Sequence, residues 1–198
     1  MKHAAPLIYL ASQSPRRRAL LRQLGIPHRV LVPDVNEAPL PRETPEDHVR
    51  RLARIKAEVG AMRVLKRRWP PLPVLAADTV VVLGRTLLGK PVDAAEAAAM
   101  LARLSGRRHR VLTAVALAFQ GKLQLALSDT QVVFRRLAAS EIEAYVASGE
   151  PLDKAGGYGI QGRAAAFVRR IEGSYSGVMG LPLFETAELL RKIGIRIP

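Results

Sequence analysis

Runs of apolar residues alternate with helical stripes along the first half of the chain. Residues 7–11 and 28–32 are short apolar runs typical of strands, and residues 15–24 between them show helical spacing that stops at a glycine. A longer helix is predicted over residues 44–68, because a threonine, a proline and two acidic residues begin it and prolines follow it. Residues 74–83 are typical of a buried strand, which a single carboxylate interrupts.

The second half adds elements of both kinds. A helix is predicted over residues 94–104, where an aspartate and a glutamate three residues apart mark its start. Residues 111–119 and 122–134 flank a Gln-Gly pair and predict a long hairpin. Three shorter elements complete the pattern: a helix that Ser140 caps and that runs to Ser148, a strand at 165–171 and a helix at 182–193.

This order predicts an α/β fold with one mixed, twisted sheet and flanking helices on both faces. We expect a single domain over residues 1–198, bent into two lobes around a central cleft. At 198 residues and 48% hydrophobic composition, such a chain buries its core without disulfides or metals. The absence of cysteine excludes redox chemistry and disulfides.

Targeting signals are not evident in the sequence. The start of the chain, residues 1–6, lacks the apolar region of a signal peptide. The longest apolar run, residues 111–119, is far shorter than the ~20 residues that a membrane span needs. We therefore expect a soluble, cytoplasmic protein with no membrane partner.

The net charge of +14 admits two interpretations. It could mark a polyanion partner, either a nucleotide or a nucleic acid. It could equally reflect arginines spread over solvated helix faces. Because aromatic residues make up only 5% of the chain and provide few stacking platforms, we favour solvated faces and expect no nucleic-acid partner. Part of the surplus charge would still attract a triphosphate.

Five short polar stretches together indicate a phosphate-handling pocket; they lie at residues 12–17, 77–79, 89–91, 153–156 and 158–162. The first has the order strand, turn, helix, with Ser14 as cap and a proline at the first helical position. A helix N-terminus leaves backbone N–H groups unpaired and favours anions. Ser12, Ser14, Arg16 and Arg17 are therefore candidate phosphate ligands, with plain surface charge as the alternative for the arginines.

Asp78 is the best candidate for a catalytic base, because an unpaired carboxylate in a buried strand is costly unless a metal or cation accompanies it. The alternative is a strand-end aspartate that bonds a turn. Glu37 is a candidate second metal-facing carboxylate, or else an exposed loop acid. Lys56, on the long helix, would by itself be assigned to a solvated face.

These motifs, in this order from about Leu7 to Leu190, resemble the Maf family of nucleoside triphosphate pyrophosphatases. The resemblance implies a Maf/ITPase-like fold and a catalytic role for Asp78 within Ala-Asp-Thr. It also implies phosphate-binding roles for Lys56 and for Lys90 of Gly-Lys-Pro. The implied cofactor is a divalent cation, Mg²⁺ or Mn²⁺, held by Glu37 and Asp78.

Within the family, the branch that cleaves dTTP and UTP is the one most similar to this chain. It carries Arg17, Thr79 and Gln161 at the matching positions, which the resemblance assigns to specificity. The Gln161 amide offers a donor and an acceptor, as pairing with a uracil or thymine edge requires. Lys154 is expected to pair with Asp153 and to contact phosphate. Gln13 departs from the small residue that is common there.

The expected reaction is metal-assisted attack of water on the α-phosphorus of dTTP, UTP or modified pyrimidine triphosphates, giving the monophosphate and pyrophosphate. Two alternatives stay open. One is a 7-methyl-GTP pyrophosphatase of a related branch, which differs after the aspartate and in the Tyr-Gly-Ile-Gln segment. The other is a non-hydrolytic nucleotide-binding regulator of cell division, since the family is associated with inhibition of septum formation. A homodimer is also left open.

Overall fold

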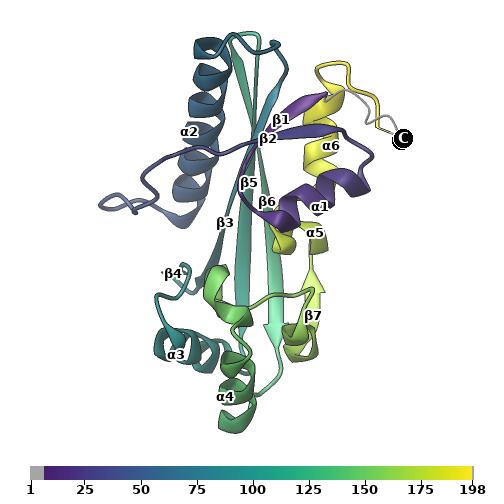
Figure 1. The fold of residues 1–198 in the computed structure, drawn as a ribbon. Coiled ribbons are helices and arrows are strands. Elements are labelled where there is room, and N and C mark those ends of the chain that lie inside the picture. Colours follow the sequence, from purple (N-terminus) through teal and green to yellow (C-terminus); the bar gives the residue numbers. More distant parts are fainter. Residues whose placement is uncertain (1–6, 198) are drawn as a thin grey trace. The chain divides into compact units, whose positions relative to one another are not determined.

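The computed structural model describes residues 7–197, so the segment used above to judge a signal peptide lies outside it. One mixed sheet of seven strands, in the order β2-β1-β3-β5-β6-β7 with β4 beside β3, runs through the fold (Figure 1). Its strands are β1 (Ile8–Ala11), β2 (His28–Leu31), β3 (Val74–Leu83), β4 (Thr86–Leu88), β5 (Arg108–Phe119), β6 (Lys122–Phe134) and β7 (Val168–Glu172). Strand β1 pairs in parallel with β2 and β3, whereas β3–β4 and β6–β7 are antiparallel. The expected mixed α/β sheet is confirmed.

The chain folds into two compact units, as expected for two lobes. Unit 1 holds the described residues up to Asp78, together with Thr113–Ser128 and those from Gly180 onward. Unit 2 holds Thr79–Leu112 and Asp129–Met179. The chain passes from one unit to the other within strands β3, β5 and β6.

Unit 1 is a three-layer arrangement around parallel strands. Figure 1 shows α2 (Pro45–Lys66) on one side of these strands and α1 (Pro15–Gln23) with α6 (Leu183–Arg191) on the other. The buried side of α2 follows helical spacing, and its members are His48, Val49, Leu52, Ala53, Lys56, Ala57, Gly60 and Val64. None of the described helices is both long and apolar enough to cross a bilayer.

Gly60 lets α2 approach the sheet closely. A Cβ at this position would lie 2.8 Å from Val74 Cγ1, 2.9 Å from Leu31 Cδ2 and 3.3 Å from Ala11 Cβ. A mid-helix glycine costs about 1 kcal/mol relative to alanine, so its presence here has a packing reason. The missing methyl group is what allows α2 to lie against β1, β2 and β3.

Unit 2 surrounds an aromatic core. Phe134, Tyr158 and Phe167 pack edge to face, with ring centroids 4.8 Å apart for Phe134–Tyr158 and 6.1 Å for Phe134–Phe167. The helical elements of this unit are α3 (Ala94–Leu104), α4 (Ala139–Ala147), α5 (Tyr175–Met179) and the short 3₁₀ turns at Glu150–Asp153, Ala155–Gly157 and Arg163–Phe167.

Three of the four helix caps that the sequence predicts are present in the structure. Ser14, Thr44 and Asp93 each accept a backbone N–H of their own first turn, as predicted. The predicted cap at Ser140 is wrong, because α4 begins at Ala139 and Ala138 is its N-cap. The Glu141 carboxylate accepts the N–H of Ala138 at 2.9 Å, so an acid inside the first turn fixes this helix start in place of a capping hydroxyl.

Two predicted strand regions can be compared directly with the structure. The hairpin is confirmed: β5 and β6 are neighbours, and the turn residues Gln120 and Gly121 have φ of 49° and 73°. Two successive positive φ values match the twist of the flanking strands. The strand predicted at 165–171 is partly wrong, since residues 163–167 form a 3₁₀ turn and β7 starts at Val168.

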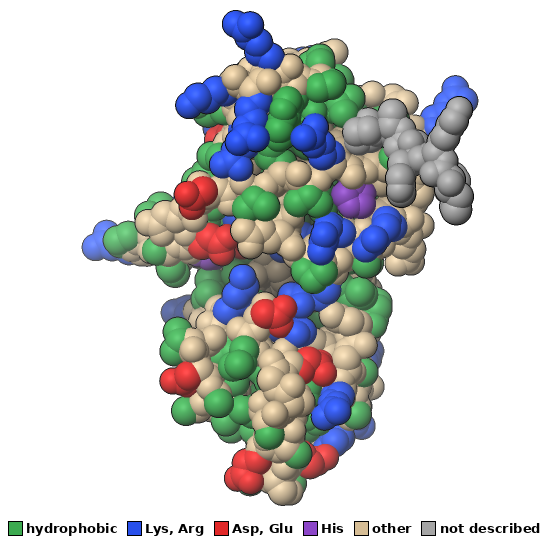
Figure 2. All heavy atoms as spheres, viewed as in Figure 1, with side chains coloured by type: hydrophobic (Ala, Val, Ile, Leu, Met, Phe, Trp, Pro, Cys, Tyr) green, Lys and Arg blue, Asp and Glu red, His purple; other side chains and the backbone are tan. Residues whose placement is uncertain are grey.

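Lys and Arg side chains are interspersed with apolar and acidic ones on the face shown in Figure 2. Several basic side chains are paired locally, such as Arg110 with Asp129 at 2.6 Å and Arg135 with Glu141 at 2.6 Å. On this face the distribution agrees with the interpretation of the +14 charge as solvated surface.

His109 is buried in the aromatic core of unit 2. It is 2% exposed, its Nε2 lies 2.8 Å from the Tyr158 hydroxyl, and its ring packs against Phe134. Its Nδ1 has no hydrogen-bond partner within the described residues. Burial lowers the pKa of His109 from its usual 6.5 to about 4.

Acid is therefore expected to destabilise the protein through His109. In the unfolded chain this imidazole takes up a proton below about pH 6.5, whereas in the folded chain it does so only near pH 4. Its contribution is fully present above pH 6.5 and is lost as the pH falls, by about 3 kcal/mol over the whole interval. Denaturant unfolding of wild type and His109→Gln between pH 7 and 4 measures this, with His28→Gln as control. Parallel pH curves for wild type and His109→Gln would contradict it.

Candidate active site

Lys56 is the buried centre of a group of three charges in unit 1. It projects from the buried side of α2 and is 6% exposed. Its Nζ lies 2.7 Å from Asp78 Oδ1 and 2.6 Å from Glu37 Oε1. The assignment of Lys56 to a solvated face is therefore wrong, because two carboxylates converge on its ammonium group.

Asp78 lies inside β3 rather than at its end. It is 6% exposed, and the strand residues before it, from Val74 to Ala77, are buried and apolar. A buried carboxylate needs a charged partner, and Lys56 provides it. Glu37 reaches the same ammonium from the loop between β2 and α2, with a side chain 52% exposed. The turn-bonding alternative for Asp78 does not describe this site.

The N-terminus of α1 holds a hydroxyl and guanidinium network. Ser14 Oγ accepts the N–H of Arg17 at 3.4 Å, and Ser12 Oγ accepts the N–H of Ser14 at 3.1 Å. Arg17 Nη1 donates to Ser12 Oγ at 3.4 Å, and its Nε donates to the carbonyl of Gly180 at 2.7 Å. These bonds fix the Arg17 side chain over the first turn, which confirms the strand-turn-helix order there.

Arg17 is electrostatically coupled to the carboxylates. Burial lowers the pKa of its guanidinium from the usual value, the negative charges of Asp78 and Glu37 act in the opposite direction, and neighbouring Arg16 adds to the lowering. These charges therefore lie close enough to interact. The structure thus brings the predicted residues of unit 1 together, namely Ser12, Ser14, Arg16, Arg17, Glu37, Lys56 and Asp78.

The two carboxylates are suited to a hard divalent cation. Oxygen ligands are those that Mg²⁺ and Mn²⁺ prefer, and Mg²⁺ is commonly held by one or two carboxylates together with substrate phosphates and water. Among the described residues, no group of three or more His, Asp or Glu gathers as a metal cage. Glu37 and Asp78 already share one cation, the Lys56 ammonium, so their arrangement fits a cation that the substrate helps to bind.

Lys90 and the glycine-rich segment are joined within unit 2. Lys90 is exposed in the loop between β4 and α3, and the carbonyl of the preceding Gly89 accepts the N–H of Gly156 at 2.9 Å. Gly156 has φ of 69°, and a Cβ there would lie 2.8 Å from Val81 Cγ2. Glycine is therefore required for the segment to pass so close to β3.

Lys154 makes the local ion pair that the sequence predicts. Its Nζ donates to Asp153 Oδ1 at 2.5 Å and to the carbonyl of Glu150 at 2.6 Å. Its aliphatic chain lies against Gly159, where a Cβ would approach to 2.7 Å. The order of the glycine-rich loop thus depends on Lys154, while its contact with phosphate stays a prediction.

Gln161 occupies the exposed part of a tight turn. The N–H of Gly162 donates to the carbonyl of Gly159 at 3.0 Å, so the backbone alone closes this turn. The Tyr145 hydroxyl accepts the N–H of Gly159 at 3.1 Å and donates to Glu150 Oε1 at 3.0 Å. The Gln161 side chain makes no hydrogen bond to the described part of the chain, so its amide is available to a ligand.

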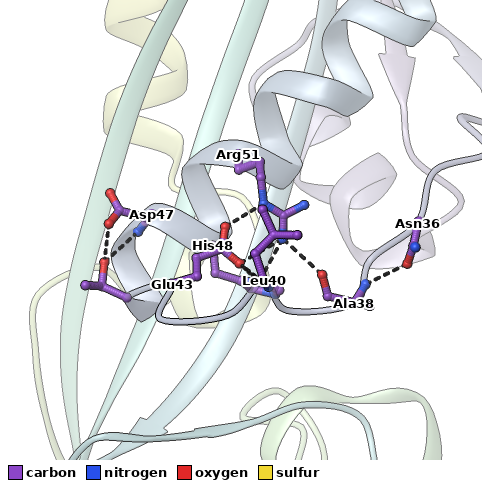
Figure 3. Close-up of polar contacts among 8 residues, drawn as sticks. Asn36, Ala38, Leu40, Glu43, Asp47, His48 and Arg51 are labelled. Carbon is purple, nitrogen blue, oxygen red and sulfur yellow. Dashed lines mark hydrogen bonds and ion pairs between the residues drawn. The ribbon is translucent and has the colours of Figure 1, made fainter.

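Sequence reasoning missed a second polar cluster in unit 1, formed by Glu43, His48 and Arg51 (Figure 3). Glu43 lies at the end of the loop that carries Glu37, and the other two lie in the first turns of α2. No local pattern marks this cluster, because Glu43 and Arg51 are eight residues apart. Lys56, by contrast, was detectable, since it shares the apolar stripe of Leu52 and Ala53.

This chain is similar to known proteins over nearly its whole length. The family model described as Maf-like protein matches residues 7–193. The dTTP/UTP pyrophosphatase of Nitrosomonas europaea is 55% identical over 202 residues, covering 98% of both chains, and that of Cupriavidus metallidurans is 56% identical over 195 residues, covering 96% of this chain and 98% of its own. The Ham1 protein of Staphylococcus aureus is structurally more distant, with a TM-score of 0.40 and 14% identity over 64% of this chain and 71% of its own.

Proposed function

The chain belongs to the Maf family, and we propose that it is a dTTP/UTP pyrophosphatase that releases pyrophosphate and the nucleoside monophosphate. The observation that carries this proposal is the buried Asp78 carboxylate, held with Glu37 on the ammonium of Lys56 beside the N-terminus of α1. Such an arrangement combines a base, a cation site and phosphate ligands.

Asp78 acts on water in this proposal. Water attacks the α-phosphorus, Asp78 accepts a proton from that water, and the bond from the α-phosphorus to the bridging oxygen breaks, so that pyrophosphate leaves with this oxygen. Lys56 orients Asp78 and Glu37 through its two short ion pairs. A bound Mg²⁺ or Mn²⁺, held by Glu37 and Asp78, would neutralise the negative charge that develops on the phosphates.

Cationic groups bind the triphosphate. Arg16, Arg17 and the first-turn N–H groups of α1 are suited to phosphate oxygens, since guanidinium groups and helix N-termini both favour anions. Ser12 and Ser14 add hydroxyls at the same turn. Lys56, Lys90 and Lys154 complete the proposed phosphate ligands.

Base recognition is assigned to Arg17, Thr79 and Gln161. Thr79 directly follows Asp78 in β3, and the Gln161 amide is exposed at its turn. A pyrimidine edge presents both a donor and an acceptor, which one amide matches.

The proposal is tested with a panel of nucleoside triphosphates, including dTTP, UTP, CTP, GTP and 7-methyl-GTP, incubated with Mg²⁺ or Mn²⁺. We expect monophosphate and pyrophosphate chiefly from dTTP and UTP. Preferred cleavage of 7-methyl-GTP would instead support the related branch. Tight binding without turnover would support a non-hydrolytic regulator. Gel filtration tests the homodimer, and the proposal further places the enzyme in the cytoplasm without a nucleic-acid partner.

Replacing Gln161 with alanine is expected to lower kcat/KM for dTTP and UTP by ~1–3 kcal/mol of transition-state binding, because one polar contact to the base is lost. Cleavage of CTP and GTP should change much less. The kinetics for the four triphosphates and the melting temperature of the variant check this, with Gln23→Ala, at the exposed last residue of α1, as the control. A uniform loss accompanied by unfolding would remove Gln161 from the specificity site.

A further inference from the structure

The loop that carries Glu37 is fastened to α2 by one guanidinium group. Arg51 Nε donates to Glu43 Oε1 at 2.5 Å, and its Nη2 donates to Glu43 Oε2 at 2.8 Å. This two-pronged contact is the strongest geometry available to an arginine and a carboxylate. The same Nη2 also donates to the carbonyl of Ala38 at 3.1 Å, so Arg51 contacts the loop at two separate points (Figure 3).

The Glu43 carboxylate is almost fully withdrawn from solvent. Its side chain is 7% exposed, and it further accepts the N–H of Leu40 at 3.0 Å and lies 3.0 Å from His48 Nδ1. The bond to Arg51, with smaller help from Leu40 and His48, lowers the pKa of Glu43 to about 2. The pair is therefore charged at neutral pH.

These contacts hold the backbone next to Glu37. The Asn36 side chain accepts the N–H of Ala38 at 2.9 Å, in a turn that spans Glu37. The carbonyl of the same Ala38 accepts from Arg51 at 3.1 Å. The residue that follows Glu37 is thus held through both its N–H and its carbonyl, while the Glu37 side chain is half exposed and reaches Lys56.

We propose that Arg51 is a positioning residue, which fixes the loop through Glu43 and Ala38 so that the Glu37 carboxylate is held beside Lys56 and Asp78. This inference rests on the proposed function and deepens it. Without Arg51 the loop ends would keep their connection to β2 and α2, but the carbonyl of Ala38 and the Glu43 carboxylate would lose the group that holds them to α2. A misplacement of about 1 Å in a reacting group can lower a rate by about 10²-fold.

The first experiment measures the loop itself, without nucleotide. Amide hydrogen exchange of residues 33–43 is compared between wild type, Arg51→Gln and Arg54→Gln. Arg54 is the matched control, because it lies on the same helix in an exposed ion pair with Glu58 at 2.9 Å. We expect at least about tenfold faster exchange at Leu40 in Arg51→Gln alone. Unchanged exchange would overturn the inference, whatever the activity of the protein.

The second experiment measures turnover of dTTP in a double-mutant cycle with Glu37→Gln. We expect Arg51→Gln to lower kcat about 10- to 100-fold and to raise the Mn²⁺ concentration for half-maximal rate, with little change in KM for dTTP. In the Glu37→Gln background the same change should cost less than about threefold. Equal losses in both backgrounds would show a general structural role and overturn the inference.

Two further variants complete the test. Arg51→Lys keeps the charge but cannot form the two-pronged contact, so it should not restore kcat. If Arg51→Gln does not fold, Glu43→Gln, which keeps the side-chain shape, takes its place in both experiments. A lack of turnover in the unmodified protein would overturn the proposed function alone, since the exchange experiment needs no activity.

Discussion

Replacing Asp78 with asparagine is expected to lower kcat for dTTP by at least ~10², in line with the loss of a general base. The amide keeps the shape of the side chain but cannot accept a proton from water, and it is a poorer ligand for a divalent cation. Because Asp78 accepts from Lys56 through one oxygen, the amide oxygen can keep that hydrogen bond and the fold should persist. Steady-state kinetics and thermal unfolding of the same preparation measure both effects.

Asp129→Asn is the matched control for this change. Asp129 also lies in a long strand and also pairs with a cation, Arg110 at 2.6 Å, but its side chain is 44% exposed. Exposed pairs contribute little, so its variant should retain nearly full activity and stability. Near-normal turnover in folded Asp78→Asn would remove Asp78 as the base.

Replacing Lys56 with methionine is expected to destabilise the protein by about 3 kcal/mol. Methionine fills the volume of the aliphatic stem but leaves the Asp78 carboxylate buried without its cation, and uncompensated buried charges typically cost ~3–5 kcal/mol. The lower figure is appropriate because Glu37, the other partner, is half exposed and can turn to water. Urea unfolding monitored by circular dichroism measures the change.

A second substitution separates this charge effect from lost packing. Asp78→Asn added to Lys56→Met removes the stranded charge, so the double variant should recover most of the lost stability. Lys66→Met, an exposed position in the last turn of α2, should be nearly neutral. A double variant no more stable than Lys56→Met alone would show that the cost lies in packing.

The elements that sequence predicted well are those with strong local chemistry. Asp93 and Thr44 cap helices because their side chains accept N–H groups of the turn that follows them, a contact that needs no distant partner. The Gln120-Gly121 turn is similarly local. The cap predicted at Ser140 is wrong because the Glu141 carboxylate, from inside the helix, accepts the N–H of Ala138 and fixes the start of α4 there. Strand β4, three residues long, leaves too little pattern to detect.

In the candidate site, too, the contacts made within one local motif could be predicted from sequence, and those between distant segments could not. Ser14 and Arg17 belong to one turn, so their proximity follows from a single motif. The contact of Arg17 with the Gly180 carbonyl spans 163 positions of the chain, and that of Lys56 with Asp78 spans 22. Such contacts are products of packing, and composition or periodicity carries no record of them.

The close approach of α2 at Gly60 has a consequence for the chemistry one helical turn away. Lys56 and Gly60 lie four residues apart on the same side of α2, so the clearance between this helix and the sheet also sets how far the Lys56 stem must extend to meet Asp78. A methyl group at position 60 would widen that clearance without altering any charge. The distance that Lys56 must span to reach Asp78 is thus set by the absence of a side chain at position 60, a residue that bears no functional group.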